Sequence, residues 1–507
     1  MTDTAEGTFC LVLHSHLPWL PHHGTWPVGE EWLYQAWAHS YLPMVELLER
    51  FAAEGRRDVL TLGMTPVLAA QLDDPYSIRA CHDWLGHWQL RAQHASTLWR
   101  DDPLLRELAA AEHRTAVRAA EELGTRWRHG FSPILRSLVD SSTIEVLGGP
   151  LAHPFQPLLD PRVREFALNA GLTDTALRLG SRPEGIWAPE CGYAPGMEKD
   201  YAAAGVRRFM VDGPSLRGET WAARPVGDSD VHAFGRDLEV TYRVWSPKAG
   251  YPGHAAYRDF HTWAHEVGLK ASRVTGKTIE PQDKAPYDPS LAADVLGLHV
   301  KDFVDTVVTR LRSLKRQHGR ESLVVAAYDT ELFGHWWHEG PAWLEGVLRS
   351  LPEAGVRVTT LKGALEAGHV GPPIDLPASS WGSGKDWRVW DGEQVQDMVE
   401  ANTALQGRLL DLVAGLETTA RDAVADQAVA EAMLALESDW AFMVTKDSAA
   451  DYARRRAAVH TERFDALAGA LRRGDRARGE ELAAAYRADD GPFGHLDARA
   501  LKTLKHY

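Results

Sequence analysis

The sequence contains little cysteine and no long apolar segment at its start. Its three cysteines, Cys10, Cys81 and Cys191, are odd in number and widely spaced among 507 residues. This usage does not suit a disulfide framework and is typical of a reducing compartment. The N-terminus, Met1 to Glu6, is acidic and leads into a short apolar run, so we expect neither a signal peptide nor a membrane span. These absences predict a cytoplasmic protein.

Positive charge is also in deficit. The chain carries 55 Lys and Arg against 70 Asp and Glu, a formal net charge of -15. Recognition of nucleic acid or of anionic membranes depends on clustered basic side chains, so we expect neither as a partner. An uncharged polysaccharide suits this balance. Tryptophan, in contrast, is abundant, and while most tryptophans are expected to pack in the core, a few could offer flat faces to sugar rings.

Short apolar, β-branched runs alternate with helical patterns, and several runs end at a polar residue. Such alternation predicts parallel β/α units, and a β/α barrel keeps its chemistry at the ends of its strands. The sequence therefore predicts an α/β fold with a barrel of about seven or eight strands. The runs are Phe9 to Leu13, Val59 to Leu62, Ile144 to Leu147, Gly185 to Trp187, Phe209 to Val211 and Leu323 to Ala327.

Two changes in pattern divide the chain. Residues 74–140 lose the strand signal and have apolar residues at helical spacing, which predicts a helical insertion in the barrel. The stretch Gly371 to Pro377 is rich in proline and predicts a linker. We therefore expect a catalytic barrel over residues 1–370 and a helical C-terminal domain over residues 371–507, whose Ala- and Leu-rich stretches favour helices.

Two isolated acids follow apolar runs and lie among aromatic residues. These acids are Asp329, in the segment Ala327 to Trp337, and Glu190, in the segment Gly185 to Tyr193. Cleaving and remaking a glycosidic bond requires two such carboxyl groups, one as nucleophile and one as proton donor. A lone acid after a strand can instead cap a helix, and Glu331 competes equally with Asp329 for the chemical role. The pair predicts carbohydrate chemistry.

His14 and His16 close the first predicted strand, and because side chains alternate along an extended chain, both imidazoles are expected on the same side. Such a pair can bind a metal, with His153 and Asp212 at other strand ends as further ligands. It can equally donate hydrogen bonds to substrate hydroxyls, or serve only the structure. A metal-dependent deacetylase or amidohydrolase using His14, His16 and His153 is thus one alternative function.

Four segments follow one another along nearly the whole chain, and they are His14 to Trp19, Gly148 to Phe155, Trp187 to Tyr193 and Tyr328 to Trp337. In this order they resemble glycoside hydrolase family 57. This resemblance implies a distorted, TIM-like barrel of seven β/α units, a retaining mechanism with Glu190 as nucleophile and Asp329 as acid and base, and no metal or organic cofactor. Within the family the segments look most like those of members that branch α-1,4-glucans, as in glycogen synthesis.

The same resemblance implies a set of substrate contacts. A segment like the family's glucan-binding stretch runs from Arg236 to Gly253, and another, from Trp381 to Trp390, resembles the start of its C-terminal domain. For each tryptophan, core packing is at least an even alternative. The implied contacts are His14, His16, Trp19, His153, Arg236, Trp245, Gly253, Trp381, Trp390, Asp439 and Ser448.

Two departures from the branching members bear on the reaction. At Ser448 those members often carry a longer amide side chain. Between Asp212 and Arg236 they tend to carry a mobile loop with a tyrosine, whereas this stretch is short and offers only Trp221 and Phe234 as aromatic residues. A cover over the intermediate favours a sugar acceptor over water. An α-amylase or 4-α-glucanotransferase is therefore the nearest rival, and a glucan-binding protein with a vestigial pair is a third interpretation.

Overall fold

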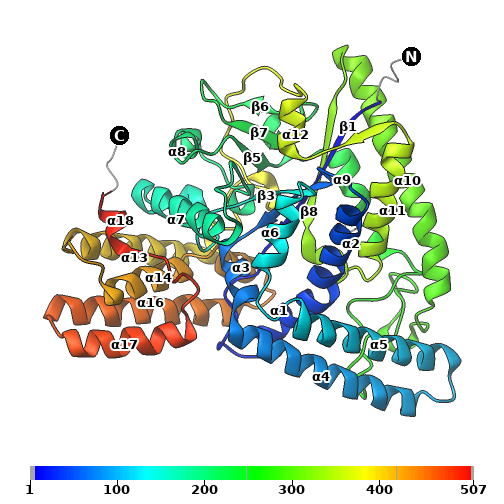
Figure 1. Cartoon of the computed structure of the whole chain (residues 1–507), viewed down its shortest axis with the longest axis horizontal. Helices are drawn as coiled ribbons and strands as arrows, with labels where there is room; N and C mark the ends of the chain where they lie inside the picture. The colour runs from blue at the N-terminus through cyan, green and yellow to red at the C-terminus, as the bar shows by residue number, and fades with distance from the viewer. Residues whose placement is uncertain (1–5, 247, 418, 504–507) are drawn as a thin grey trace.

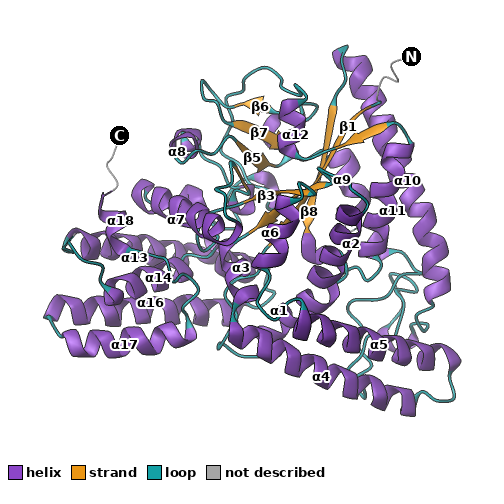
Figure 2. Cartoon of the chain, in the orientation of Figure 1, coloured by secondary structure: helices purple, strands orange, loops and turns teal. Residues whose placement is uncertain are grey.

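The computed structural model describes residues 6–246, 248–417 and 419–503. Residues 1–5, at the acidic start, and Pro247, in the predicted glucan-binding stretch, lie outside the described residues. Strands gather at the centre of the molecule and helices surround them (Figures 1 and 2). None of the helices in the described ranges is long and apolar enough to cross a membrane.

The strands form two sheets. In the first, the order is β3-β2-β1-β8, with β9 also pairing with β1, and all its pairs are parallel. In the second, the order is β4-β5-β7-β6, with β6 antiparallel to β7. The strands are β1 (Gly7–Ser15), β2 (Leu60–Met64), β3 (Ile144–Leu147), β4 (Gly185–Ile186), β5 (Arg208–Val211), β6 (Arg224–Pro225), β7 (His232–Gly235), β8 (Leu323–Asp329) and β9 (Val356–Val358).

All six apolar runs of the sequence form strands, so the predicted α/β class is confirmed. The predicted closed barrel is not confirmed by this topology, because the two sheets meet without a regular ladder. One parallel bridge joins Gly148, just after β3, to Ile186 of β4. On the other side, the backbone N–H of Asp237, just after β7, donates to the carbonyl of Val325 in β8 over 2.8 Å.

Helices cover the sheets and begin with a recurrent signal. In α4, α5, α7 and α10 an Asp-Pro pair starts the helix, where proline fits the first turn and the aspartate accepts backbone N–H bonds. The helices up to residue 366 are α1 (Glu30–Ala36), α2 (Leu42–Ala53), α3 (Pro66–Asp73), α4 (Pro75–Leu98), α5 (Pro103–Thr125), α6 (Ser132–Asp140), α7 (Pro161–Leu179), α8 (Met197–Ala203), α9 (Leu238–Trp245), α10 (Pro289–His318), α11 (Gly340–Glu353) and α12 (Leu361–Glu366).

The predicted insertion corresponds to α4, α5 and α6, of which α4 and α5 form a long antiparallel pair projecting from the molecule (Figure 1). Beyond the proline-rich stretch the chain is mainly helical and lies beside the sheets. Most of its apolar residues pack in a second cluster together with Trp19, α3 and α7, while Trp440, Met443 and Tyr452 join the main core. The helices of this C-terminal region are α13 (Gln396–Ala414), α14 (Ala423–Ala435), α15 (Ser438–Thr445), α16 (Ala450–Arg473), α17 (Arg476–Asp489) and α18 (Ala498–Thr503).

Candidate active site

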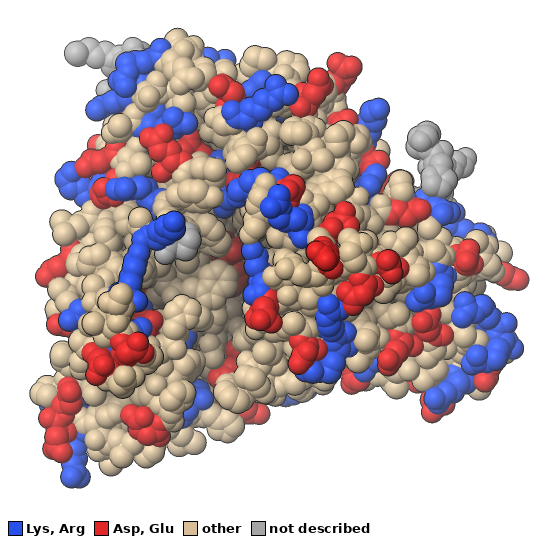
Figure 3. Space-filling model, turned by 180° about the vertical axis from the view of Figure 1, so that it is seen from behind, with Lys and Arg blue, Asp and Glu red and all other residues tan. Residues whose placement is uncertain are grey.

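A cleft of about 1290 Å³ lies at the carboxyl ends of the strands. It opens on the face shown in Figure 3, where the surface is deeply hollowed. Both predicted catalytic acids, Glu190 and Asp329, line it. The structure also brings most predicted contacts to its wall, which are His14, His16, His153, Arg236, Trp245, Trp381, Trp390, Asp439 and Ser448.

Two predicted contacts do not reach this cleft. Trp19 is 4% exposed and packs in the C-terminal apolar cluster, where its indole N–H donates to the carbonyl of Asp489 over 3.2 Å. Gly253 lies in a tight turn that lines a separate cavity of about 210 Å³. Trp390 does line the cleft, but its ring is 2% exposed and stacks on Phe155, with ring centroids 4.6 Å apart. For Trp390, core packing therefore dominates.

Glu190 is held in an unusual backbone conformation directly after β4. Its φ is 59° and that of Cys191 is 51°, in the left-handed region that costs residues other than glycine about 1–3 kcal/mol each. The side chain is 8% exposed, and its two oxygens accept hydrogen bonds of 2.8 Å from the Trp381 indole and the Ser438 hydroxyl. The surrounding structure thus fixes both the backbone and the carboxylate.

Burial raises the pKa of Glu190 to about 7, and the charge of Asp439 adds to this effect. The hydrogen bonds from Trp381 and Ser438 act in the opposite direction, because they favour the ionised carboxylate. The carboxyl group is therefore poised to change its charge near neutral pH.

A chain of hydrogen bonds leads from His14 to Glu190. Because the Ser438 hydroxyl donates to Glu190, it accepts from Nδ1 of His153, 3.0 Å away. Burial lowers the pKa of His153 well below its usual value, so this imidazole is neutral and its Nε2 accepts a hydrogen bond from Nε2 of His14 over 3.2 Å. His14 in turn stacks on Trp187. The chain orients the rings beside the nucleophile candidate.

His16 lies directly after β1 and projects to the same side as His14, as expected for alternating side chains of an extended chain. Its Nδ1 lies 3.1 Å from the Thr65 hydroxyl, and its Nε2 lies 2.8 Å from the Asp439 carboxylate. His16 also stacks on His153, with ring centroids 3.7 Å apart. Asp439, from α15, is therefore connected to the strand ends through a histidine.

Asp329 ends β8 and is the register partner of His14 in β1, so the two side chains point to the same face. Its carboxylate accepts no hydrogen bond from any of the described residues. Burial raises its pKa well above the usual range, and the charges of Glu331 and Glu190 raise it further. These effects favour the protonated form of Asp329, whose carboxyl group lines the cleft.

Glu331, the alternative acid, also lines the cleft, but its carboxylate is already engaged in hydrogen bonds. Its Oε1 accepts hydrogen bonds from the Tyr41 hydroxyl and from the backbone N–H of His16. Burial raises its pKa to about 7. The geometry therefore separates two acids that the sequence left equal, and it favours Asp329.

A buried ion-pair network supports the opposite wall. Arg236 donates to Oδ1 of Asp212 over 3.0 Å, while the Lys385 ammonium lies 2.5 Å from the other carboxylate oxygen. The Arg236 guanidinium also lies 5.5 Å from the centre of the Trp381 ring. Its Nη1 is buried without a partner among the described residues, which leaves a donor for a ligand. Trp245 stacks near Trp381 at 6.4 Å.

The cluster His16, His153 and Asp439 brings three potential metal ligands together, as the metal interpretation requires. A second such cluster, His23, His460 and Asp490, lies between the N-terminal segment and the C-terminal helices. In the second cluster, the guanidinium of Arg463 forms an ion pair with Asp490 and already places a positive charge beside it. Only the first cluster adjoins the acids of the cleft.

Sequence reasoning missed Ser438, Lys385 and Thr65, which contact predicted site residues directly. The signal for Ser438 was its neighbour Asp439, one residue along the chain. Neither of the aromatic residues considered as a cover reaches the cleft. Trp221 stacks on His318 with ring centroids 4.3 Å apart, and Phe234 is fully buried in β7. The short stretch from Asp212 to Arg236 therefore forms a 3₁₀ turn (Gly213–Leu216) and two short strands instead of an aromatic lid.

Comparison with known proteins agrees with this geometry. The profile of "Glycosyl hydrolase family 57" matches residues 10–373, and that of "1,4-alpha-glucan branching enzyme, C-terminal" matches residues 402–500. A probable 1,4-alpha-glucan branching enzyme of Mycobacterium tuberculosis is 57% identical, with 98% of each chain covered.

Solved structures give the same result. A family 57 branching enzyme from Pyrococcus horikoshii superposes with a TM-score of 0.92 at 29% identity, covering 98% of this chain and 97% of the other. The α-amylase AmyC from Thermotoga maritima superposes with a TM-score of 0.89 at 25% identity, covering 99% and 100%. With the family profile matched over most of its length, the chain belongs to glycosyl hydrolase family 57 and is an enzyme of that family.

Proposed function

We propose that this enzyme is a 1,4-alpha-glucan branching enzyme that acts on a glycogen-like glucan, with retention of configuration. The observation that carries the proposal is the pairing of two buried carboxyl groups in one cleft, one held by hydrogen bonds and the other without a hydrogen-bond partner among the described residues and with a raised pKa. The 57% identity to a probable branching enzyme and the match of residues 402–500 to a branching-enzyme C-terminal domain support it over hydrolysis.

The reaction proceeds in two displacements. The carboxylate of Glu190 attacks the anomeric carbon, the bond to the 4-oxygen breaks, and Asp329 gives its proton to that oxygen. A covalent glucosyl ester remains on Glu190. Asp329 then takes the proton of an incoming 6-hydroxyl, whose oxygen displaces Glu190 and forms the α-1,6 branch. These steps need neither metal nor organic cofactor.

The remaining polar groups of the cleft suit neutral sugar hydroxyls. We assign substrate contacts to His14, His16, His153, Arg236, Trp245, Trp381, Asp439 and Ser448, which line the cleft around the acids, and a lesser one to Trp390. Asp439 and Ser448 belong to the C-terminal region and line the cleft. Their position supports a catalytic domain over residues 1–370 and a helical C-terminal domain over residues 371–507 that completes the cleft.

The proposal also covers the architecture of the barrel and the cellular location of the enzyme. The bridge between Gly148 and Ile186 and the hydrogen bond from Asp237 to Val325 support an incomplete seven-stranded barrel, made of β1, β2, β3, β4, β5, β7 and β8. The three cysteines are unpaired and buried, which supports a cytoplasmic enzyme.

The product of amylose treatment tests this function. Branching creates short chains that are released only when a debranching enzyme is added, whereas an α-amylase releases them without it. We expect new short chains after debranching and few before it. Chelator-treated protein serves as the starting material, so activity that requires restored divalent metal would favour the metal-dependent alternative. Products that do not change on debranching would contradict branching.

The pH profile of kcat/KM reports the ionisation of Glu190 in the free enzyme. Because the nucleophile must be ionised, activity rises with pH through its pKa, about 7. Ser438→Ala removes one hydrogen bond that lowers this pKa, so we expect the acidic limb of the profile to move to higher pH. The value of kcat/KM at pH values above this limb should change less. An acidic limb at the same pH in both proteins would contradict the assignment of Glu190.

A further inference from the structure

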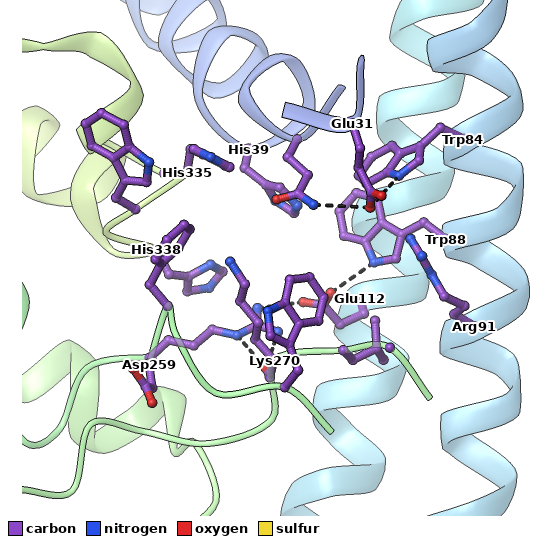
Figure 4. Close-up of a pocket in the computed structure, with 18 residues that line it drawn as sticks. Glu31, His39, Trp84, Trp88, Arg91, Glu112, Asp259, Lys270, His335 and His338 are labelled. Carbon is purple, nitrogen blue, oxygen red and sulfur yellow. Dashed lines mark hydrogen bonds and ion pairs between the residues drawn. The ribbon is translucent and has the colours of Figure 1, made fainter. Parts of the chain in front are cut away.

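A side pocket opens from the cleft between the helical insertion and the segments 258–270 and 334–338 (Figure 4). Trp84, Trp88 and Arg91 of α4 form one wall, and His335 lies on the opposite side. The side pocket is continuous with the cleft, because both are lined by Arg91, Lys270, Trp263 and Trp336. The proposed cleavage of the glycosidic bond uses none of these residues.

The acidic groups of the side pocket are already engaged. Glu112 pairs with Arg258 at 2.7 Å and accepts the indole N–H of Trp88 at 3.0 Å. Glu31 accepts the indole N–H of Trp84 at 3.1 Å and a side-chain N–H of Gln35 (Figure 4). These bonds fix the rings of the wall and leave little acceptor capacity for a cationic ligand.

Two cationic side chains of the side pocket, Lys270 and Arg91, in contrast keep donors without an acceptor among the described residues. The Lys270 ammonium lies 3.6 Å from the centre of the Phe260 ring and 4.9 Å from that of Trp263, and no carboxylate among the described residues forms an ion pair with it. Nε of Arg91 is buried and has no hydrogen-bond partner in the described part of the chain. A buried donor without an acceptor is costly, so a ligand that supplies oxygens would be bound.

Aromatic faces accompany these donors. Trp263 and Trp336 are 37% and 38% exposed at the opening of the side pocket, although large apolar rings are normally covered. A glucose ring offers apolar C–H faces for stacking and hydroxyl oxygens around its edge. Its chemistry matches a pocket of exposed rings and free N–H donors.

We propose that the opening of the side pocket, where Trp263, Trp336 and Lys270 also face the cleft, is a second glucan-binding subsite, at which a glucose unit of the α-1,4-glucan stacks remote from the reacting bond. The proposal rests on the function proposed above, because the same chain must run through the cleft between the acids and the side pocket. Chains long enough to occupy both places gain affinity. The side pocket therefore selects for chain length.

Binding and product analysis test this subsite with Trp263→Ala and Lys270→Met, the second of which keeps the apolar stem of the side chain. Leu90→Ala is the matched control, because Leu90 is 63% exposed on α4 and lines neither cavity. Calorimetry is done with maltotriose and with long maltooligosaccharides, in a Glu190→Gln background that prevents turnover. We expect both variants to bind long chains about tenfold more weakly and maltotriose unchanged, with the control unaffected.

In the active background, the two variants should also change the lengths of the transferred branches. Unchanged affinity for long chains in both variants, or an equal loss for short and long chains, would overturn the subsite. The outcomes remain separable from those of the proposed function. A wild type that binds long chains through the side pocket but makes no branches refutes branching alone, and a branching wild type whose variants behave like the control refutes the subsite alone.

Discussion

Glu190→Gln is expected to lower kcat on amylose by about 10⁵-fold or more, since an amide cannot form the glucosyl ester. The substitution fits the site. The amide oxygen can accept from the Trp381 indole, and the amide N–H₂ can donate to the Ser438 hydroxyl, which is both donor and acceptor. The loss therefore reports chemistry and not a collapsed cleft.

Thermal unfolding provides the control for folding. Glu190 is a buried carboxyl group whose charged form is disfavoured, so a neutral amide of the same shape should leave Tm unchanged or raise it. Glu184→Gln is the matched substitution, because Glu184 lies just before β4 and its side chain is 61% exposed. We expect Glu184→Gln to keep full activity. Substantial glucan turnover by a folded Glu190→Gln protein would remove Glu190 from the mechanism.

The strands that carry the site were predictable because of where they lie. Strands of a parallel sheet are buried on both faces, so they read as continuous apolar runs, as in Phe9 to Leu13. A polar residue ending such a run stands at the sheet edge, which is why His14 and Asp329 could be expected together. In contrast, β6, β7 and β9 were missed. The strand β6, Arg224–Pro225, has only two residues, and β9, Val356–Val358, carries an exposed arginine at its centre.

Barrel closure could not be read from the sequence for a related reason. It depends on single contacts between chain segments, such as the bridge of Gly148 to Ile186, which leave no periodic pattern. The two sheets contain the expected strands, but residues at their junctions do not reveal how far a ladder extends. Only the class of fold follows from apolar runs.

The site was predictable where local sequence restricts the backbone. Glu190 stands between Pro189 and Gly192, which break regular structure, and the turn there places it in the left-handed region. Its partner Ser438 lies 248 residues away, and no local pattern connects the two. The positions of Trp19 and Gly253, which do not line the cleft, have the same origin. A motif fixes the residue types, whereas long-range packing decides which of them face the cleft.

Asp329→Ala is expected to lower turnover of amylose by about 10²–10⁴-fold, because the leaving oxygen then departs without a proton. The defect should depend on the leaving group. With an α-maltosyl fluoride the C–F bond breaks without protonation, so Glu190 still forms its ester and fluoride is released. Because the second step lacks its base, a maltosyl adduct on Glu190 should accumulate. Mass spectrometry of the peptide that contains Glu190 would detect it.

Azide distinguishes Asp329 from its neighbour Glu331. As an anion that needs no base, azide should displace Glu190 in the Asp329→Ala protein and release α-maltosyl azide, with turnover partly restored. Glu331→Gln serves as the matched variant, since Glu331 is bound to Tyr41 and to the backbone of His16 and does not offer a free proton. It should show no adduct and no rescue. The reverse pattern, with rescue only in Glu331→Gln, would transfer the acid and base role to Glu331.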